Sequence, residues 1–199
     1  MPPTACFPCL STGATTRRHF VSRWACVAAA GLLPSWGWAK PPAGAPALLL
    51  ASEAPAGIEP SGYLVSEKYD GVRALWDGQQ LRLRGGAAVS APAWFSAALP
   101  PVALDGELWL GRGQFDAVSG LVRSARIEDP TWRVLRYLVF ELPGADGSFA
   151  QRAQRLRQLS GASPQGLWQA VMQHEVKDRS ALLSKLAQVT AGGGEGLML

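Results

Sequence analysis

The sequence predicts an α+β domain built on an antiparallel sheet, and three observations support this fold class. Short β-rich runs separated by turn residues come first, a strict alternation of apolar and polar residues follows, and two capped helices come later. Hairpins followed by interleaved helices are typical of α+β domains. We expect this domain over residues 48–199, after an export signal at 1–39 and a Pro- and Ala-rich linker at 40–47.

The first 39 residues have the three-part layout of a secretory signal. The arginine pair at 17–18 precedes an apolar stretch from Trp24 to Leu33, and Gly37-Trp38-Ala39 provides a small-residue cleavage site. The arginine pair followed by Phe20 resembles a twin-arginine export signal, which predicts a periplasmic mature protein. The alternative is an N-terminal helix packed on the domain.

Cleavage after Ala39 changes the composition. The whole chain carries a formal charge of +4 and three cysteines, whereas the mature part keeps 16 basic and 15 acidic residues and no cysteine. A charge this small does not by itself indicate a nucleic-acid partner. No apolar run reaches the ~18 residues that span a bilayer as a helix, so we expect no membrane segment in the mature protein. We also expect a monomer.

Period-two patterns and turn residues predict the strands. The segment at 104–110 is the clearest, because Leu104, Gly106 and Leu108 alternate with polar residues or tryptophan on the other face. Asp-Gly turns at 70–71 and 77–78 separate the earlier runs. The predicted strands cover residues 63–68, 72–77, 80–84, 104–110, 133–142 and the terminal 196–199.

Two later segments are predicted as helices by their caps. Ser148 and Gln151 form a capping box, and Asp178 can cap a second helix that ends at the glycines 192–194. Apolar residues recur at helical spacing behind each cap, at Phe149, Ala153 and Leu156 in the first helix and at Leu182, Leu186 and Val189 in the second.

Lys68 is the first candidate for chemistry. It is the only lysine between Lys40 and Lys177, in a chain that otherwise uses arginine, and it lies where a strand gives way to a turn. A lysine amine can lose its proton and act as a nucleophile, whereas arginine stays charged. The alternative is an ordinary surface lysine in a hairpin.

Five blocks in order carry a family resemblance. They are Lys68-Tyr69-Asp70-Gly71-Val72-Arg73, Arg84-Gly85-Gly86, Leu104-Asp105-Gly106-Glu107-Leu108, the segment 137–142 and Glu195-Gly196-Leu197-Met198-Leu199. These blocks resemble the motifs of the nucleotidyltransferase superfamily of ATP-dependent DNA ligases and capping enzymes. Segments 61–63, 91–95 and 110–115 are most similar to the small exported bacterial ligases. The resemblance covers residues 48–199, as an adenylation domain.

The resemblance implies a three-step reaction. Lys68 would attack ATP to form a lysyl-AMP, the AMP would pass to the 5′-phosphate at a nick in double-stranded DNA, and the 3′-hydroxyl would then displace it. The same resemblance implies the other site residues: Arg73 and Glu107 at the ribose, Phe140 stacked on adenine, Ser66 near the amino edge of the base, Glu195 at Mg²⁺ with Asp70 in its outer shell, and Arg84 at the DNA 5′-phosphate.

Several of these residues have a simpler interpretation. Phe140 shares an expected strand face with Leu138 and Leu142 and could be an ordinary core residue, while Glu107 and Glu195 could be solvated. His174 is expected to be a strand or surface histidine. The basic helix side at Arg152, Arg155 and Arg157 could contact DNA phosphate or simply face solvent.

Two departures from the family pattern qualify the expectation. Residue 141 is Glu where related ligases often carry Asp, which is conservative. The sequence also stops at Leu199, before the lysine motif and the small OB-fold domain that follow in the family, so we expect an incomplete adenylation domain. Three hypotheses remain: a DNA ligase, an inactive remnant that binds nucleotide or DNA ends, and a related RNA-end ligase.

Overall fold

The computed structural model describes residues 48–161, 163 and 166–199. The predicted export signal at 1–39 and linker at 40–47 lie outside these residues. The strands are β1 (Leu64–Lys68), β2 (Val72–Trp76), β3 (Leu81–Leu83), β4 (Leu104–Trp109), β5 (Arg136–Glu141), β6 (Trp168–Ala170), β7 (His174–Glu175) and β8 (Gly196–Met198). The helices are α1 (Ala93–Ala97), α2 (Phe115–Arg123), the short 3-10 helix η1 (Pro130–Arg133), α3 (Phe149–Ser160) and α4 (Arg179–Ala191).

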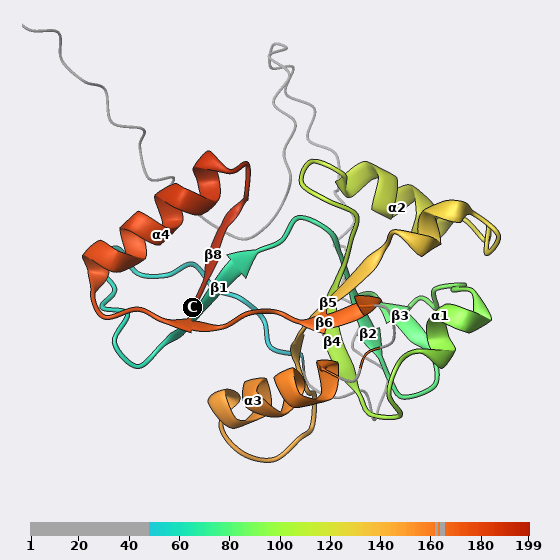
Figure 1. Cartoon of the computed structure of the whole chain (residues 1–199), viewed down its shortest axis with the longest axis horizontal. Coiled ribbons are helices and arrows are strands. Elements are labelled where there is room, and N and C mark those ends of the chain that lie inside the picture. Colours follow the sequence, from blue (N-terminus) through green and yellow to red (C-terminus); the bar gives the residue numbers. More distant parts are fainter. Residues whose placement is uncertain (1–47, 162, 164–165) are drawn as a thin grey trace, which may run out of the picture.

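The strands form two sheets. The larger has the order β3-β2-β4-β5-β6 and is antiparallel except for the parallel pair β5–β6, and the smaller has the order β7-β1-β8 and is antiparallel. Figure 1 shows β1 and β8 beside α4, with the larger sheet and helices α1 and α2 on the opposite side. The predicted α+β class is confirmed, with one parallel pair that the sequence pattern did not indicate.

The two Asp-Gly turns have different structural outcomes. At 77–80 the expected hairpin forms, and the Asp77 carboxylate accepts hydrogen bonds from the N–H groups of Gln79 and Gln80. At 70–71 the chain does not turn back, because β1 and β2 belong to different sheets. A Cβ at Gly71 would lie 2.3 Å from the Leu108 carbonyl oxygen, so only glycine allows the chain to cross this close to β4.

The predicted strand at 133–142 is wrong at its start. Residues 130–133 form η1, because Asp129 accepts a hydrogen bond from the Thr131 N–H and Pro130 follows it at the first helical position. The strand begins at Arg136. Helices α1 and α2 and strand β6 were not expected, whereas His174 lies exposed on β7, consistent with the expectation of a strand or surface residue.

A bulge interrupts the pairing of β4 with β5. Asp105 pairs with Glu141 and Gly106 with Val139, which leaves Phe140 as the extra residue. The bulge changes the alternation, so Leu142 joins Tyr137 and Val139 in the core. The expectation that Leu142 shares a face with Phe140 is therefore wrong, because simple alternation does not account for the extra residue.

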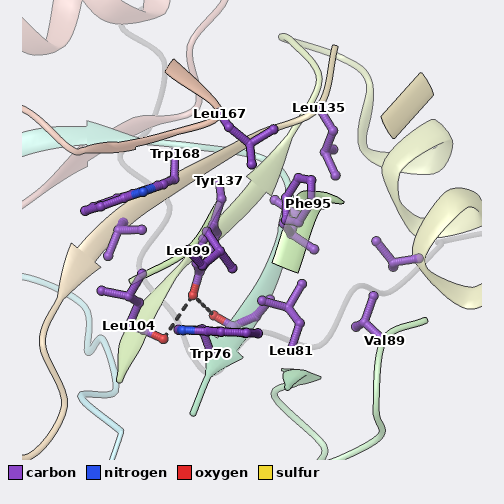
Figure 2. Packing of buried hydrophobic residues seen from close by; sticks show 14 of the residues in the cluster. Trp76, Leu81, Val89, Phe95, Leu99, Leu104, Leu135, Tyr137, Leu167 and Trp168 are labelled. Carbon is purple, nitrogen blue, oxygen red and sulfur yellow. Dashed lines mark hydrogen bonds between the residues drawn. The ribbon is translucent and has the colours of Figure 1, made fainter. Parts of the chain in front are cut away.

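The main core lies between the larger sheet and the helices that cover one of its faces (Figure 2). Phe95 of α1 and Trp132 of η1 are fully buried and meet edge to face, with ring centroids 5.2 Å apart. The Tyr137 hydroxyl lies 2.9 Å from the carbonyl oxygens of both Ala74 and Leu104, so the buried ring also ties β5 to β2 and β4. Burial raises the pKa of Tyr137 well above its ordinary value, which keeps the hydroxyl protonated as a donor.

The two predicted helices and their caps are confirmed. Ser148 and Gln151 form the reciprocal capping box of α3, whose Ala153 and Leu156 are buried, while the Asp178 carboxylate accepts from the Ala181 N–H at 2.7 Å to start α4. Among the residues that the structure describes, no helix has the length and apolar character needed to span a membrane.

Candidate active site

Lys68 and Glu195 meet at the junction between the two sheets. Antiparallel pairing of β1 with β8 places Lys68 opposite Gly196, and the Lys68 Nζ lies 3.1 Å from the Glu195 Oε2. Both side chains remain accessible, with 48% and 41% of their surfaces exposed. Their ion pair is therefore screened by water and adds little stability, which leaves the amine available to a ligand.

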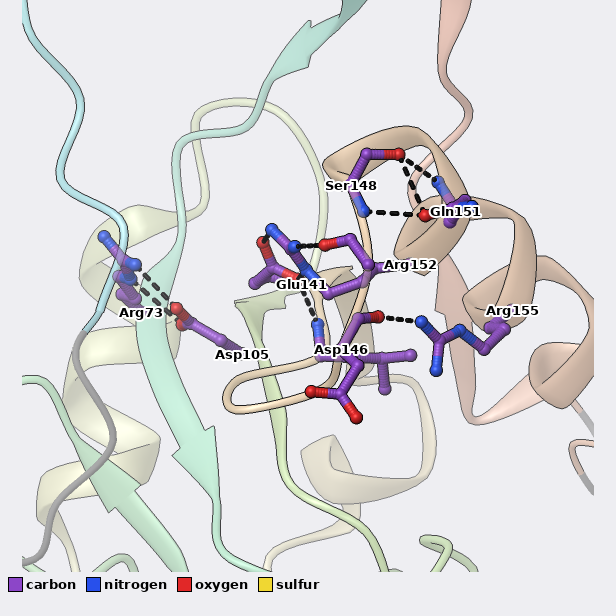
Figure 3. A network of polar contacts seen from close by, with 10 residues as sticks. Arg73, Asp105, Glu141, Asp146, Ser148, Gln151, Arg152 and Arg155 are labelled. Atoms are coloured by element: carbon purple, nitrogen blue, oxygen red, sulfur yellow. Dashed lines mark hydrogen bonds and ion pairs between the residues drawn. The ribbon is translucent and has the colours of Figure 1, made fainter.

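Arg73 is held rigidly on the neighbouring strand β2. Its guanidinium donates to both carboxylate oxygens of Asp105 at 3.0 and 2.6 Å (Figure 3), and the Asp105 side chain is fully buried. The same group donates to the Leu49 carbonyl at 2.7 Å and lies over the Phe140 ring, 5.3 Å from its centroid. Burial is the largest single influence and lowers the pKa of Arg73, but the hydrogen bond to Asp105 together with the nearby negative charges of Asp105 and Glu107 outweighs it and raises the pKa.

Glu107 lies beside Arg73, because the two residues are direct partners across β4 and β2. Burial raises the pKa of Glu107 to about 7, although the positive charge of Arg73 and a hydrogen bond from the Gly71 N–H oppose the increase. The negative charges of Asp105 and Asp70 add to it. Near neutral pH this carboxyl can therefore be either a hydrogen-bond donor or an acceptor.

The remaining predicted site residues differ from one another in burial and location. Ser66 is buried on β1, two positions before Lys68 and on the same strand face, and Asp70 is half-buried in the segment joining β1 to β2. Arg84 is exposed just beyond β3 and, within the described ranges, has no hydrogen bond or ion pair to the other site residues. The structure thus gathers the predicted nucleotide residues but leaves Arg84 apart from them.

Sequence reasoning missed two contacts beside Lys68. Arg112, in the loop after β4, pairs with Glu67 at 2.7 Å, and the Tyr69 ring packs edge to face on Trp109 with centroids 5.5 Å apart. No local spacing predicts the ion pair, because its partners are 45 residues apart. The Arg152 expectation also needs correction, because its guanidinium binds the buried Glu141 carboxylate at 2.7 and 2.8 Å and is neither a solvated cation nor free for DNA.

Two surface hollows and the acidic residues can be compared with the predicted site, within the part of the chain that the structure describes. Hollows of about 490 and 680 Å³ lie beside α3 and the loop before it, and neither is lined by a predicted site residue. No group of three or more His, Cys, Asp or Glu suited to a metal ion occurs in the part of the chain that the structure describes.

Comparison with known proteins shows similarity to DNA ligases. No family model matches the chain. A DNA ligase of Haemophilus influenzae strain Rd is 37% identical over 138 residues, which are 69% of this chain and 51% of that protein. The solved structure of a Lig E DNA ligase matches with 43% identity and a TM-score of 0.66, over 71% of this chain and 56% of its own. Over the residues that they share, the chain is therefore related to DNA ligases.

Other DNA ligases share the fold at lower identity. The structure of the Chlorella virus DNA ligase-adenylate matches with a TM-score of 0.56 at 18% identity, over 68% of this chain and 51% of that one. The described region thus has the fold of a ligase adenylation domain, as the five sequence blocks predicted. The chain spans about half the length of the curated relative that it matches.

Proposed function

We propose that this protein is an ATP-dependent DNA ligase that seals nicks in double-stranded DNA through a covalent AMP on Lys68. One observation carries the proposal. The accessible Lys68 amine, 3.1 Å from Glu195, lies three residues before Gly71, whose N–H donates to Glu107 beside Arg73. Relatives named as DNA ligases support the same activity.

The residues at the junction fit a nucleotide. Phe140 is half-buried, which suits a ring that stacks on a base, and the adjacent Arg73 is already fixed by the buried Asp105. Glu107 offers a carboxyl that can donate or accept a hydrogen bond to the ribose hydroxyls, and Ser66 offers a buried hydroxyl on the strand that carries the nucleophile. We assign the ribose to Arg73 and Glu107, adenine to Phe140 and the amino edge of the base to Ser66.

The acidic residues fit Mg²⁺ only together with substrate phosphates. Mg²⁺ commonly uses one or two carboxylates and completes its shell with phosphate oxygens and water, and Glu195 would supply the carboxylate with Asp70 in the outer shell. Mg²⁺ bound there would neutralise negative charge on the phosphates. Glu195 also lies 3.1 Å from the Lys68 ammonium, so a cation bound at Glu195 would be close to the nucleophile.

The chemistry of this chain centres on Lys68. Its ammonium first loses a proton to water, and the amine nitrogen then bonds to the α-phosphorus of ATP while the bond to pyrophosphate breaks. The AMP passes from Lys68 to a DNA 5′-phosphate, which restores the amine. Attack by the 3′-hydroxyl then forms the phosphodiester and releases AMP. Arg84, exposed beyond β3, would contact the 5′-phosphate, and the protein would act as a monomer.

We also propose that residues 1–39 direct twin-arginine export to the periplasm. Because this route moves folded proteins, Lys68 can acquire AMP in the cytoplasm, where ATP is abundant, before export. The intact mass of exported protein tests this, since the mature chain should carry the mass of one AMP. Exported protein recovered only without the adduct would contradict loading before export.

Incubation with α-labelled ATP and Mg²⁺ tests the proposed activity. The protein should retain label after denaturation, Lys68→Ala should retain none, and Lys177→Ala should match the wild type because Lys177 is exposed away from the junction. Labelled protein should then seal nicked duplex DNA. Failure of the full natural protein to take up label would favour an inactive remnant, and sealing of RNA ends alone would favour the RNA ligase hypothesis.

A further inference from the structure

Arg112 connects three separate parts of the molecule. Its Nη2 and Nε donate to the Oε1 of Glu67 on β1 at 2.7 and 3.3 Å, and its Nη1 donates to the Gly192 carbonyl at 2.5 Å. Gly192 is the C-terminal cap of α4, where the last carbonyls carry partial negative charge that a cation stabilises. One side chain from the loop after β4 thus contacts both β1 and the end of α4.

The glycine run before Glu195 is packed against this side chain and its partner. A Cβ at Gly192 would lie 2.9 Å from the Arg112 Nη1, and a Cβ at Gly194 would lie 2.9 Å from the Glu67 Oε1. Gly193 has a φ of +79°, which favours glycine, and its N–H donates to the Thr190 carbonyl. The turn therefore follows the Glu67–Arg112 pair closely and leads directly into Glu195.

We infer that Arg112 is a positioning residue that sets the Lys68–Glu195 pair by holding the turn between α4 and β8. Strand alternation points Glu67 away from the face that carries Lys68, so Arg112 touches neither the amine nor the proposed nucleotide contacts. It acts through the Gly192 carbonyl and through β1. The inference rests on the proposed function, because the consequence we expect is slower transfer of AMP to Lys68.

The Glu67 carboxylate also depends on the Arg112 guanidinium for a charged partner. The Glu67 side chain is only 19% exposed, so without Arg112 its carboxylate would be left partly buried beside Gly194. Because burial of an unpaired charge is unfavourable, the Glu67 carboxylate would shift toward water or another cation and would displace the turn. Lysine at 112 keeps the charge but cannot donate to Glu67 and to the Gly192 carbonyl in the same fixed fork.

Single-turnover kinetics on the full chain tests the inference. In Arg112→Ala we expect the rate of lysyl-AMP formation at saturating ATP to fall about 10- to 100-fold, because small displacements of reacting groups have effects of this size. The ATP concentration at half-maximal rate should change less than about twofold. Arg112→Lys should recover part of the rate. The matched control is Arg82→Ala, which removes an exposed ion pair with Asp77 in the β2–β3 hairpin.

Two further measurements separate this role from a general loss of structure. Glu67→Gln combined with Arg112→Ala should be no slower than Arg112→Ala alone, because both changes break the same contact. Amide hydrogen exchange should become faster at residues 192–198 in Arg112→Ala and stay unchanged in α3. A wild-type rate in Arg112→Ala, or equal loss of rate and ATP affinity with faster exchange throughout the chain, would overturn the inference.

The two proposals can fail independently. If the wild-type protein forms no lysyl-AMP, the proposed function is wrong, and the positioning role is decided by hydrogen exchange alone. Unchanged exchange at residues 192–198 in Arg112→Ala would then reject it.

Discussion

Replacing Glu107 by Gln should flatten the pH dependence of folding stability. Glu107 is shielded from water beside β2, and burial raises its pKa from an ordinary value of 4.5 to about 7. A raised carboxyl pKa means that the folded state binds this proton more tightly than the unfolded state. The stabilisation is complete below pH 4.5 and is lost as the pH rises through about 7.

The size of the effect follows from that pKa difference. At about 1.4 kcal/mol for each tenfold change in the ionisation equilibrium, a rise from 4.5 to about 7 corresponds to about 3 kcal/mol. Glutamine keeps the shape and hydrogen bonding of the protonated acid but cannot ionise. For a domain of this size we expect the melting temperature of the wild type, relative to Glu107→Gln, to fall by about 6–12 °C between pH 4 and pH 8.

Thermal and urea unfolding of both proteins at half-unit pH steps provides the measurement. The difference between their unfolding free energies isolates Glu107, because every other titrating group is common to the two chains. Glu59→Gln is a suitable control, since Glu59 is exposed outside both sheets and should leave the profile unchanged. Parallel wild-type and Glu107→Gln profiles between pH 4 and pH 8 would refute the assignment of a raised pKa to Glu107.

Three further substitutions test the packing around the site. Arg152→Ala should destabilise the domain by about 3 kcal/mol in urea unfolding, because it leaves the buried Glu141 carboxylate without its partner; a loss below about 1 kcal/mol would contradict that pairing. Tyr137→Phe should cost about 1–2 kcal/mol in the same assay, because the single hydroxyl hydrogen shared by two buried carbonyls is lost, and an unchanged midpoint would count against the contact. Gly106→Ala places a Cβ 2.4 Å from the Leu138 carbonyl oxygen and should greatly reduce the yield of folded protein, whereas near-normal circular dichroism and melting would show that β4 and β5 can separate.

The sequence predicted the elements whose signals are local. The capping box at Ser148, the Asp178 cap and the alternation at 104–109 each depend on neighbouring residues, and each is present in the structure. Strands β6 and β7 have three and two residues and lack such local signals, and β6 joins the sheet through a parallel pairing with β5 that its neighbouring residues do not indicate. The Asp-Gly pair at 70–71 misled for a related reason, because the turn signal does not reveal which sheet the next strand joins.

The identity of the site residues could be predicted from the sequence, whereas most contacts between them and their supporting partners could not. The order of the motifs indicated Lys68, Arg73 and Glu107, which the structure brings to the sheet junction. Their supporting partners depend on register and on long-range packing. Asp105 becomes the partner of Arg73 because β2 and β4 pair as neighbours, and the Glu67–Arg112 contact joins strand β1 to a loop 45 residues away in sequence. Such pairings form only once the whole sheet is assembled, so no window of sequence contains them.

The residues at the bulge in β5, Phe140 and Glu141, have different partners. Phe140 faces Arg73 on the side of the sheet junction, while Glu141 binds Arg152 of α3. The bulge also places Leu142 in the core. A substitution at 141 would therefore remove the partner of Arg152 and loosen α3 from the sheet, whereas a substitution at 140 would leave that ion pair in place.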